Sequence, residues 1–113
     1  MLIDYQAHQF KIIPAIAQSF AFNLASNHIN DYYEQFLDML TSGQSDDFKP
    51  LAVIHHLVSC LKAYFSKNTY DTINRMRESC GGAGFSLFSG IPAIMMDYAA
   101  KVTYEGDNTV MMQ

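Results

Sequence analysis

Apolar side chains recur along this chain at spacings of three and four residues, which is the period of an α-helix. The first apolar stripe consists of Ile3, Phe10, Ile13, Ala17, Phe20 and Leu24. Gln6 fills a gap in this stripe, where an amide either meets a partner across an interface or costs free energy. Pro14 lies within the same pattern and is expected to kink the first helix rather than end it.

A second helix is predicted after a break at Ser26 and Asn27. Its apolar positions are Ile29, Tyr32, Tyr33, Phe36, Leu37 and Leu40. Residues 41–47 (TSGQSDD) are typical of a loop that closes with capping carboxylates. Pro50 then falls in the first turn of the next helix, where proline is tolerated.

The third helix has the most regular pattern. The residues of its apolar face are Leu51, Ile54, Val58, Leu61, Phe65, Thr69, Ile73, Met76 and Cys80. They recur every 3.6 residues or so with no change of phase, as in one straight helix. We therefore predict a single long helix through about residues 48–80, stopped by Gly81 and Gly82.

The remaining residues predict shorter elements. A loop over 82–90 leads to an apolar helix from Ile91 through Ala100, and a final segment covers 109–113 with Asp107 or Asn108 as its N-cap. Internal repeats, low-complexity segments and the alternation typical of strands are not found in the sequence. The prediction is an all-α helical bundle that forms one domain, residues 1–113.

Composition narrows the function classes. The chain has 113 residues, of which 50% are hydrophobic and only 16% charged. This is a high apolar content for a small domain that folds independently. The net charge of −4 provides no basic face for nucleic acid. Apolar stretches fall well short of the roughly 20 residues that a membrane span needs. Two cysteines are too few for a disulfide scaffold, so reduced thiols in an intracellular protein are expected.

Cys60 and Cys80 lie on the apolar side of the predicted long helix, which favours buried structural thiols over reactive ones. His56 and Cys60 are one helical turn apart and could offer two ligands to a metal ion. Because two further ligands are not apparent in the sequence, no metal site is expected.

Two positions could carry chemistry, and the residues alone leave each open. The glycine-rich turn CGGAGF at 80–85 is either a helix C-cap with a tight loop or a place where a cofactor approaches bare backbone. Glu105, just ahead of a predicted helix, is either a capping carboxylate or a catalytic base on an apolar-walled turn.

Four motifs, taken in order, resemble those of the acyl-CoA oxidase family, within the acyl-CoA dehydrogenase superfamily. They are DYQAHQ at 4–9, CGGAGF at 80–85, SGIP at 89–92 and TYEGDNTV at 103–110. The resemblance covers essentially the whole chain and corresponds to the first C-terminal α-helical domain of that family. It implies a domain of a longer enzyme, with a bundle of the acyl-CoA dehydrogenase C-terminal-domain type.

The resemblance also implies an activity. Family members use FAD to desaturate fatty acyl-CoA to trans-2-enoyl-CoA, and molecular oxygen then reoxidises the flavin and forms hydrogen peroxide. Glu105 matches the glutamate that removes the α-proton, and its backbone N–H is expected to hold the thioester carbonyl. Tyr104 and Gly106 are implied to lie at the substrate side of the same site.

Further residues are implied to contact the cofactor. Gln6, Gly81 and Gly82, with Tyr5 as a weaker match, correspond to positions that approach the FAD of the neighbouring subunit in a homodimer. Because the flavin site would be incomplete, the isolated chain is expected to be inactive. The resemblance places the protein in the peroxisome, although residues 111–113 (MMQ) do not form a peroxisomal targeting tripeptide.

The chain departs from the family pattern at two places. Ala83 stands where these oxidases commonly have histidine, and Phe85 where tyrosine is usual. Residues 107–109 (DNT) are oxidase-like, whereas dehydrogenases of the superfamily continue the Glu-Gly pair with Thr-Ser. Two alternatives stay open at this point: a dehydrogenase segment that uses an electron-transfer partner, and a non-catalytic helical module for dimerisation or interaction.

Overall fold

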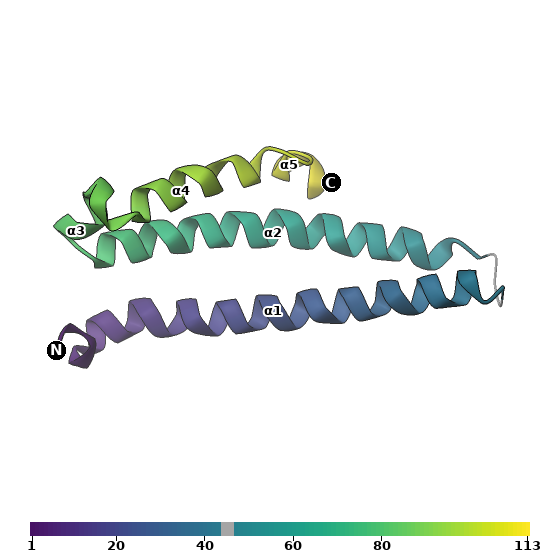
Figure 1. Ribbon diagram of the computed structural model, residues 1–113, viewed down its shortest axis with the longest axis horizontal. Helices are drawn as coiled ribbons and strands as arrows, with labels where there is room; N and C mark the ends of the chain where they lie inside the picture. Colours follow the sequence, from purple (N-terminus) through teal and green to yellow (C-terminus); the bar gives the residue numbers. More distant parts are fainter. Residues whose placement is uncertain (44–46) are drawn as a thin grey trace.

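Two long antiparallel helices form the frame of the molecule (Figure 1). The computed structural model describes residues 1–43 and 47–113. Helix α1 covers Gln6–Thr41 and helix α2 covers Lys49–Ser79. Helix α2 agrees closely with the long helix predicted for 48–80, and Pro50 lies in its first turn as expected.

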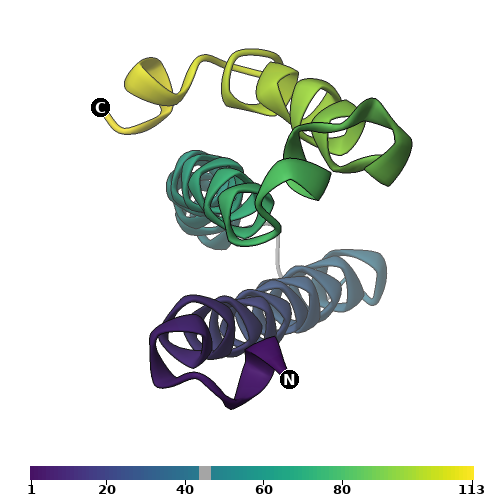
Figure 2. The same cartoon turned by 90° about the vertical axis from the view of Figure 1, so that its left-hand side faces the viewer.

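A layer of short helices covers the side of α2 that faces away from α1. Viewed end on, α2 lies between α1 and this layer (Figure 2). In chain order the short elements are η1 (Leu2–Asp4) before α1, then α3 (Gly82–Phe85), η2 (Leu87–Ser89), α4 (Ile91–Ala99), η3 (Ala100–Val102) and α5 (Asn108–Met111). The described residues are all-α, as predicted, and extend over 58 × 28 × 25 Å.

Helix α1 is one continuous helix of 36 residues, so the predicted break at Ser26 and Asn27 is wrong. Phe22 and Ile29 lie two helical turns apart on the same half-buried face, and Phe22 stacks on Phe65 of α2 with ring centroids 3.9 Å apart. Packing along this continuous face outweighs the weak helix propensity of serine and asparagine. The helix also continues through Pro14, as expected.

The first apolar stripe of the sequence does not face α2. Phe10, Phe20 and Leu24 are 78%, 66% and 69% exposed, whereas Phe22 is half-buried. Phe20 and Phe22 are two positions apart, which turns their side chains by about 200° around the helix. Helix α1 is therefore apolar on two sides, and only one of them packs within this chain.

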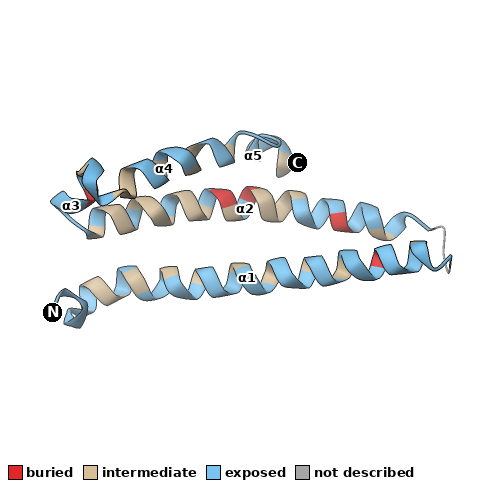
Figure 3. Ribbon diagram, in the orientation of Figure 1, coloured by how far each residue is buried: buried red, intermediate tan, exposed pale blue. Residues whose placement is uncertain are grey.

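Burial is concentrated on α2, since both other layers pack against it (Figure 3). The most buried side chains among the described residues are Phe36, Ile54, Ala63 and Ser66. The two long helices are joined by residues 42–48, of which 44–46 lie outside the described residues. Asp47 accepts a hydrogen bond from the backbone N–H of Lys49 at 3.0 Å, although the N-cap residue of α2 is Phe48.

The predicted loop over 82–90 instead contains α3 and η2. Gly81 adopts a φ of 58° and a ψ of −137°, a conformation open to glycine that lets the chain leave α2 and start a new helical turn at once. The final segment matches its prediction, because Asp107 caps α5 by accepting a hydrogen bond from the backbone N–H of Thr109 at 2.8 Å. Within the described residues, no helix is both long and apolar enough to cross a membrane.

Candidate functional site

Glu105 lies on a tight turn between η3 and α5, and its backbone is unusual. Its φ is 56°, and it is the only non-glycine residue with a positive φ among the described residues. Gly106 follows with a φ of 98°. A left-handed conformation costs a non-glycine residue about 1–2 kcal/mol. Such strain persists only where the surrounding structure imposes it. The turn must therefore be held from outside.

One support comes from the residue that caps α5. Asp107 accepts the backbone N–H of Thr109, and this hydrogen bond is the main cause that holds the pKa of the Asp107 carboxyl below its usual value. The Thr109 side chain and the charge of Lys62 act in the same direction. The carboxylate therefore stays ionised as a cap and fixes the end of the turn.

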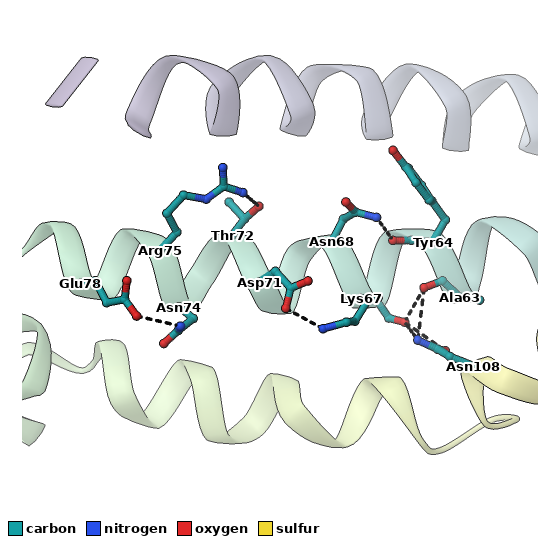
Figure 4. A network of polar contacts seen from close by, with 11 residues as sticks. Ala63, Tyr64, Lys67, Asn68, Asp71, Thr72, Asn74, Arg75, Glu78 and Asn108 are labelled. Carbon is teal, nitrogen blue, oxygen red and sulfur yellow. Dashed lines mark hydrogen bonds and ion pairs between the residues drawn. The ribbon is translucent and has the colours of Figure 1, made fainter. Parts of the chain in front are cut away.

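A second support comes from α2. Lys62 donates hydrogen bonds from Nζ to the backbone oxygen of Gly106 and, at 2.9 Å, to Oδ1 of Asn108. Asn108 in turn donates from Nδ2 to the backbone oxygen of Ala63 at 3.2 Å and to Oγ of Ser66 at 2.8 Å. Figure 4 shows Asn108 reaching α2 at this point. We call this hydrogen-bonded group the α2 anchor; its members are Lys62, Ala63, Ser66, Gly106 and Asn108.

The sequence patterns did not predict the α2 anchor. Ala63 and Ser66 are small residues one turn apart on α2, and both are buried. Their size leaves room for the Asn108 side chain, which is half-buried. These two small residues, one turn apart and outside the predicted apolar face of α2, were the available signal.

The glycine-rich turn contains three glycines with different local requirements. Gly81 has positive φ, and a Cβ there would meet nothing within 4 Å. Gly82 has neither positive φ nor any contact for an added Cβ. A Cβ on Gly84 would lie 1.9 Å from the backbone oxygen of Arg77. Gly84 is thus required by packing and Gly81 by conformation, while nothing among the described residues requires glycine at 82.

Tyr5 and Gln6 lie at the start of α1, where Tyr5 is the N-cap residue and both side chains are exposed. Beside them is an open groove of about 390 Å³ lined by Gln6, Gln9, Phe10, Ile13 and Pro14. The start of α1 and α3 lie at the same end of the bundle (Figure 1). The structure therefore brings Gln6 and the glycine-rich turn to one end of the molecule.

Glu105 is not at that end. Its turn is anchored at Lys62, and the helical rise of about 1.5 Å per residue puts Lys62 roughly 27 Å from Cys80 along α2. A flavin ring is much shorter than this separation. Glu105 and the glycine-rich turn of one chain thus cannot contact the same ring.

The expectation of two buried thiols is wrong. Cys60 is half-buried, and Cys80 is exposed because it sits at the C-cap of α2, where the chain turns away into α3. His56 Nε2 and Cys60 Sγ are 3.9 Å apart. The structure places no three His, Cys, Asp or Glu side chains together as a metal-binding group in the residues it describes.

The family model "Acyl-CoA oxidase, C-alpha1 domain" matches residues 1–113. Peroxisomal acyl-coenzyme A oxidase 1 of Bos taurus is 35% identical over 111 residues, which are 98% of this chain and 16% of that protein. The human protein of the same name is 33% identical over the same share. The chain therefore spans about one sixth of the length of these curated relatives.

Solved structures agree with the sequence comparison. Acyl-CoA oxidase-1 of Caenorhabditis elegans, described as a complex with FAD and ATP, has a TM-score of 0.88 and 33% identity over 97% of this chain and 16% of its own. Acyl-CoA oxidase 1 of Arabidopsis thaliana has a TM-score of 0.86 and 32% identity over 96% of this chain and 16% of its own. The family predicted from the four motifs is confirmed.

Proposed function

This chain belongs to the acyl-CoA oxidase family, and we propose that residues 1–113 are one domain of a longer oxidase that desaturates fatty acyl-CoA. In this proposal the domain supplies the base that removes the α-proton and part of a flavin site. Bound FAD would supply an acceptor for the β-hydrogen as hydride and a route for its electrons to molecular oxygen, with hydrogen peroxide as the product. The peroxisomal relatives support a peroxisomal location.

Glu105 is the proposed base. Its carboxylate is exposed and takes part in none of the ion pairs among the described residues, so it is available to a substrate. An acyl-CoA and a flavin packed against this turn would exclude water from the carboxylate. Desolvation makes a carboxylate a stronger base, which removal of a weakly acidic α-proton requires.

The backbone conformation of Glu105 supports a second role. Its N–H donates in none of the hydrogen bonds among the described residues and can therefore bind the thioester carbonyl of the substrate. The torsion φ fixes the direction of this N–H relative to the Cα–Cβ bond that carries the carboxylate. The positive φ of 56° thus sets the angle between the proposed carbonyl donor and the proposed base. A donor aimed at the developing enolate stabilises the charge that forms when the proton leaves.

The open backbone at the glycine-rich turn is the observation that fits a flavin. Gly82 has no conformational or packing reason to be glycine within this chain, and Gly81 and Gly82 are both exposed. A ligand that lies directly on the backbone would provide that reason. We assign this contact to Gly81, Gly82 and Gln6, with Tyr5 beside them.

The separation of roughly 27 Å along α2 supports a shared site. If Glu105 faces one flavin ring, a flavin ring at the glycine-rich turn of the same chain is a different one, as in a homodimer. One observation carries the proposal. Glu105 is strained and makes no ion pair among the described residues, and the exposed glycine backbone at 81 and 82 lies at a distant position of the same chain.

A chimera tests the assignment. This chain replaces the aligned segment of the Caenorhabditis elegans acyl-CoA oxidase-1, and peroxide release with palmitoyl-CoA is measured together with the visible flavin spectrum. We expect an active, flavin-containing chimera in which Glu105→Gln abolishes desaturation and keeps the flavin spectrum. Full activity of the Gln variant would refute the role of Glu105. Desaturation without peroxide would favour the dehydrogenase alternative.

The isolated chain provides a second test. Because it spans about one sixth of its relatives, we expect it to purify without flavin colour and without peroxide release. A misplacement of about 1 Å already costs ~100-fold in rate, and the isolated chain lacks most partners that could place a substrate. A yellow protein that turns over acyl-CoA would refute this expectation.

A further inference from the structure

We propose that Lys62 is a positioning residue that holds Glu105 in its reactive conformation; the proposal rests on the function proposed for Glu105. Lys62 lies 44 residues before Gly106, in the middle of α2, and its ammonium binds the backbone oxygen of Gly106. It does not act on the substrate itself. It fixes the peptide unit between Gly106 and Asp107, one residue beyond the proposed base.

Among the described residues, the backbone of the turn makes few hydrogen bonds. The backbone hydrogen bonds of this region stop at Tyr104, whose N–H reaches Ala100, and resume at Asp107, whose oxygen accepts from Val110 and Met111. Among the described residues, the bond from Lys62 is the only hydrogen bond made by a backbone atom of Glu105 or Gly106. Lys62 therefore provides the hydrogen bond that ties the backbone of the strained pair to α2.

The position of Lys62 is itself fixed. Its side chain is half-buried, and Nζ makes a second bond to Oδ1 of Asn108, whose amide nitrogen bonds to buried Ser66. Ammonium groups have three donors, so Lys62 can bind both oxygens at once. Hydrogen bonds from a charged donor are stronger than neutral ones. Loss of the ammonium would free the Gly106 peptide to rotate and Glu105 to leave its positive φ.

Three variants of the chimera separate this role from a general effect on folding. Lys62→Met removes the ammonium and keeps the stem, and Lys62→Gln is a second, polar replacement in case the Met variant melts below the assay temperature. Lys49→Met is the matched control, because Lys49 lies on the same helix, is exposed and is far from the turn. Each variant is compared with Glu105→Gln.

We expect Lys62→Met to lower kcat by about 10- to 100-fold, the size of effect that a small misplacement has. The KM for acyl-CoA should change by less than about threefold and the flavin content should not change, because only the reacting groups are misplaced. Lys62→Gln should change kcat in the same direction, and Lys49→Met should leave it unchanged.

A spectroscopic measurement on the 113-residue chain makes the test independent of activity. A residue with positive φ has a short distance between its amide and α protons, so Glu105 should give a strong intraresidue cross-peak in NMR. Lys62→Met should weaken this cross-peak, and Lys49→Met should not. If Lys62→Met keeps both kcat and the cross-peak while Glu105→Gln is inactive, the positioning role is overturned and the base survives. If Glu105→Gln is active, the proposed function itself fails.

Discussion

Replacing Gly84 with alanine is expected to destabilise the domain, because α3 packs directly against the backbone of α2 at this position. The added Cβ would lie 1.9 Å from the backbone oxygen of Arg77 and 2.8 Å from its carbonyl carbon. Real Cβ contacts are essentially never closer than 3.0 Å, so α3 must move away by about 1 Å. Rotation of a side chain cannot relieve this contact, since both Arg77 atoms belong to the helix backbone.

Overpacking of this kind costs typically about 1–3 kcal/mol. In a domain of this size 1 kcal/mol lowers Tm by roughly 4 °C, so a decrease of about 4–12 °C is expected. Thermal unfolding followed by circular dichroism at 222 nm measures it, since nearly all of the signal comes from helix.

Two neighbouring glycines are matched controls for the same chemical change. Gly82→Ala should stay within about 0.5 kcal/mol of the wild type, because its Cβ would enter open space at an ordinary φ. Gly81→Ala should lose about 1 kcal/mol through its positive φ alone. A Gly84 variant that melts with the wild type would refute the close approach. A Gly82 variant as unstable as that of Gly84 would refute the open backbone on which the flavin assignment depends.

Three further outcomes follow from the same structure. Glu105→Gly should raise the free energy of unfolding by up to about 1 kcal/mol in thermal melts, because glycine relieves the left-handed strain, while it removes the proposed base. The Asp107 carboxyl has a lowered pKa in the folded state, so its stabilisation is complete above its ordinary pKa of 3.8 and is lost as pH falls below that value. Asp107→Asn should therefore lose stability relative to the wild type at neutral pH, with a difference that shrinks in melts at low pH. Cys80 is exposed and Cys60 half-buried, so a thiol-reactive dye should label Cys80 first by mass spectrometry.

The fold was predictable where a single helical phase runs unbroken. From Leu51 to Cys80 the apolar period never shifts, and α2 covers nearly those residues. Ser26 and Asn27 misled the prediction because local propensity carries no information about Phe65, the α2 residue on which Phe22 stacks. A contact between distant helices decided that α1 continues.

The candidate site was predictable only in part. The resemblance identified Glu105, but residue type cannot reveal its positive φ, which is common only for glycine. Lys62 was missed because its bond to Gly106 joins a side chain to a backbone oxygen 44 residues away, and neither has a periodic pattern. Sequence motifs thus named the reacting group, whereas the structure provided what holds it.

The apolar composition has a physical explanation in the two faces of α1. One face packs on α2 through residues such as Phe22, while Phe10 and Phe20 on the opposite face remain 78% and 66% exposed. A second apolar surface surrounds a groove of about 720 Å³ beside the glycine-rich turn, where Phe88 is fully exposed. Contiguous apolar surface of this kind marks interaction sites in soluble proteins. The groove lies beside the glycine-rich turn, and the exposed face of α1 runs from Phe10, near Gln6, to the middle of the helix. Both apolar surfaces therefore adjoin residues assigned to a cofactor shared between subunits.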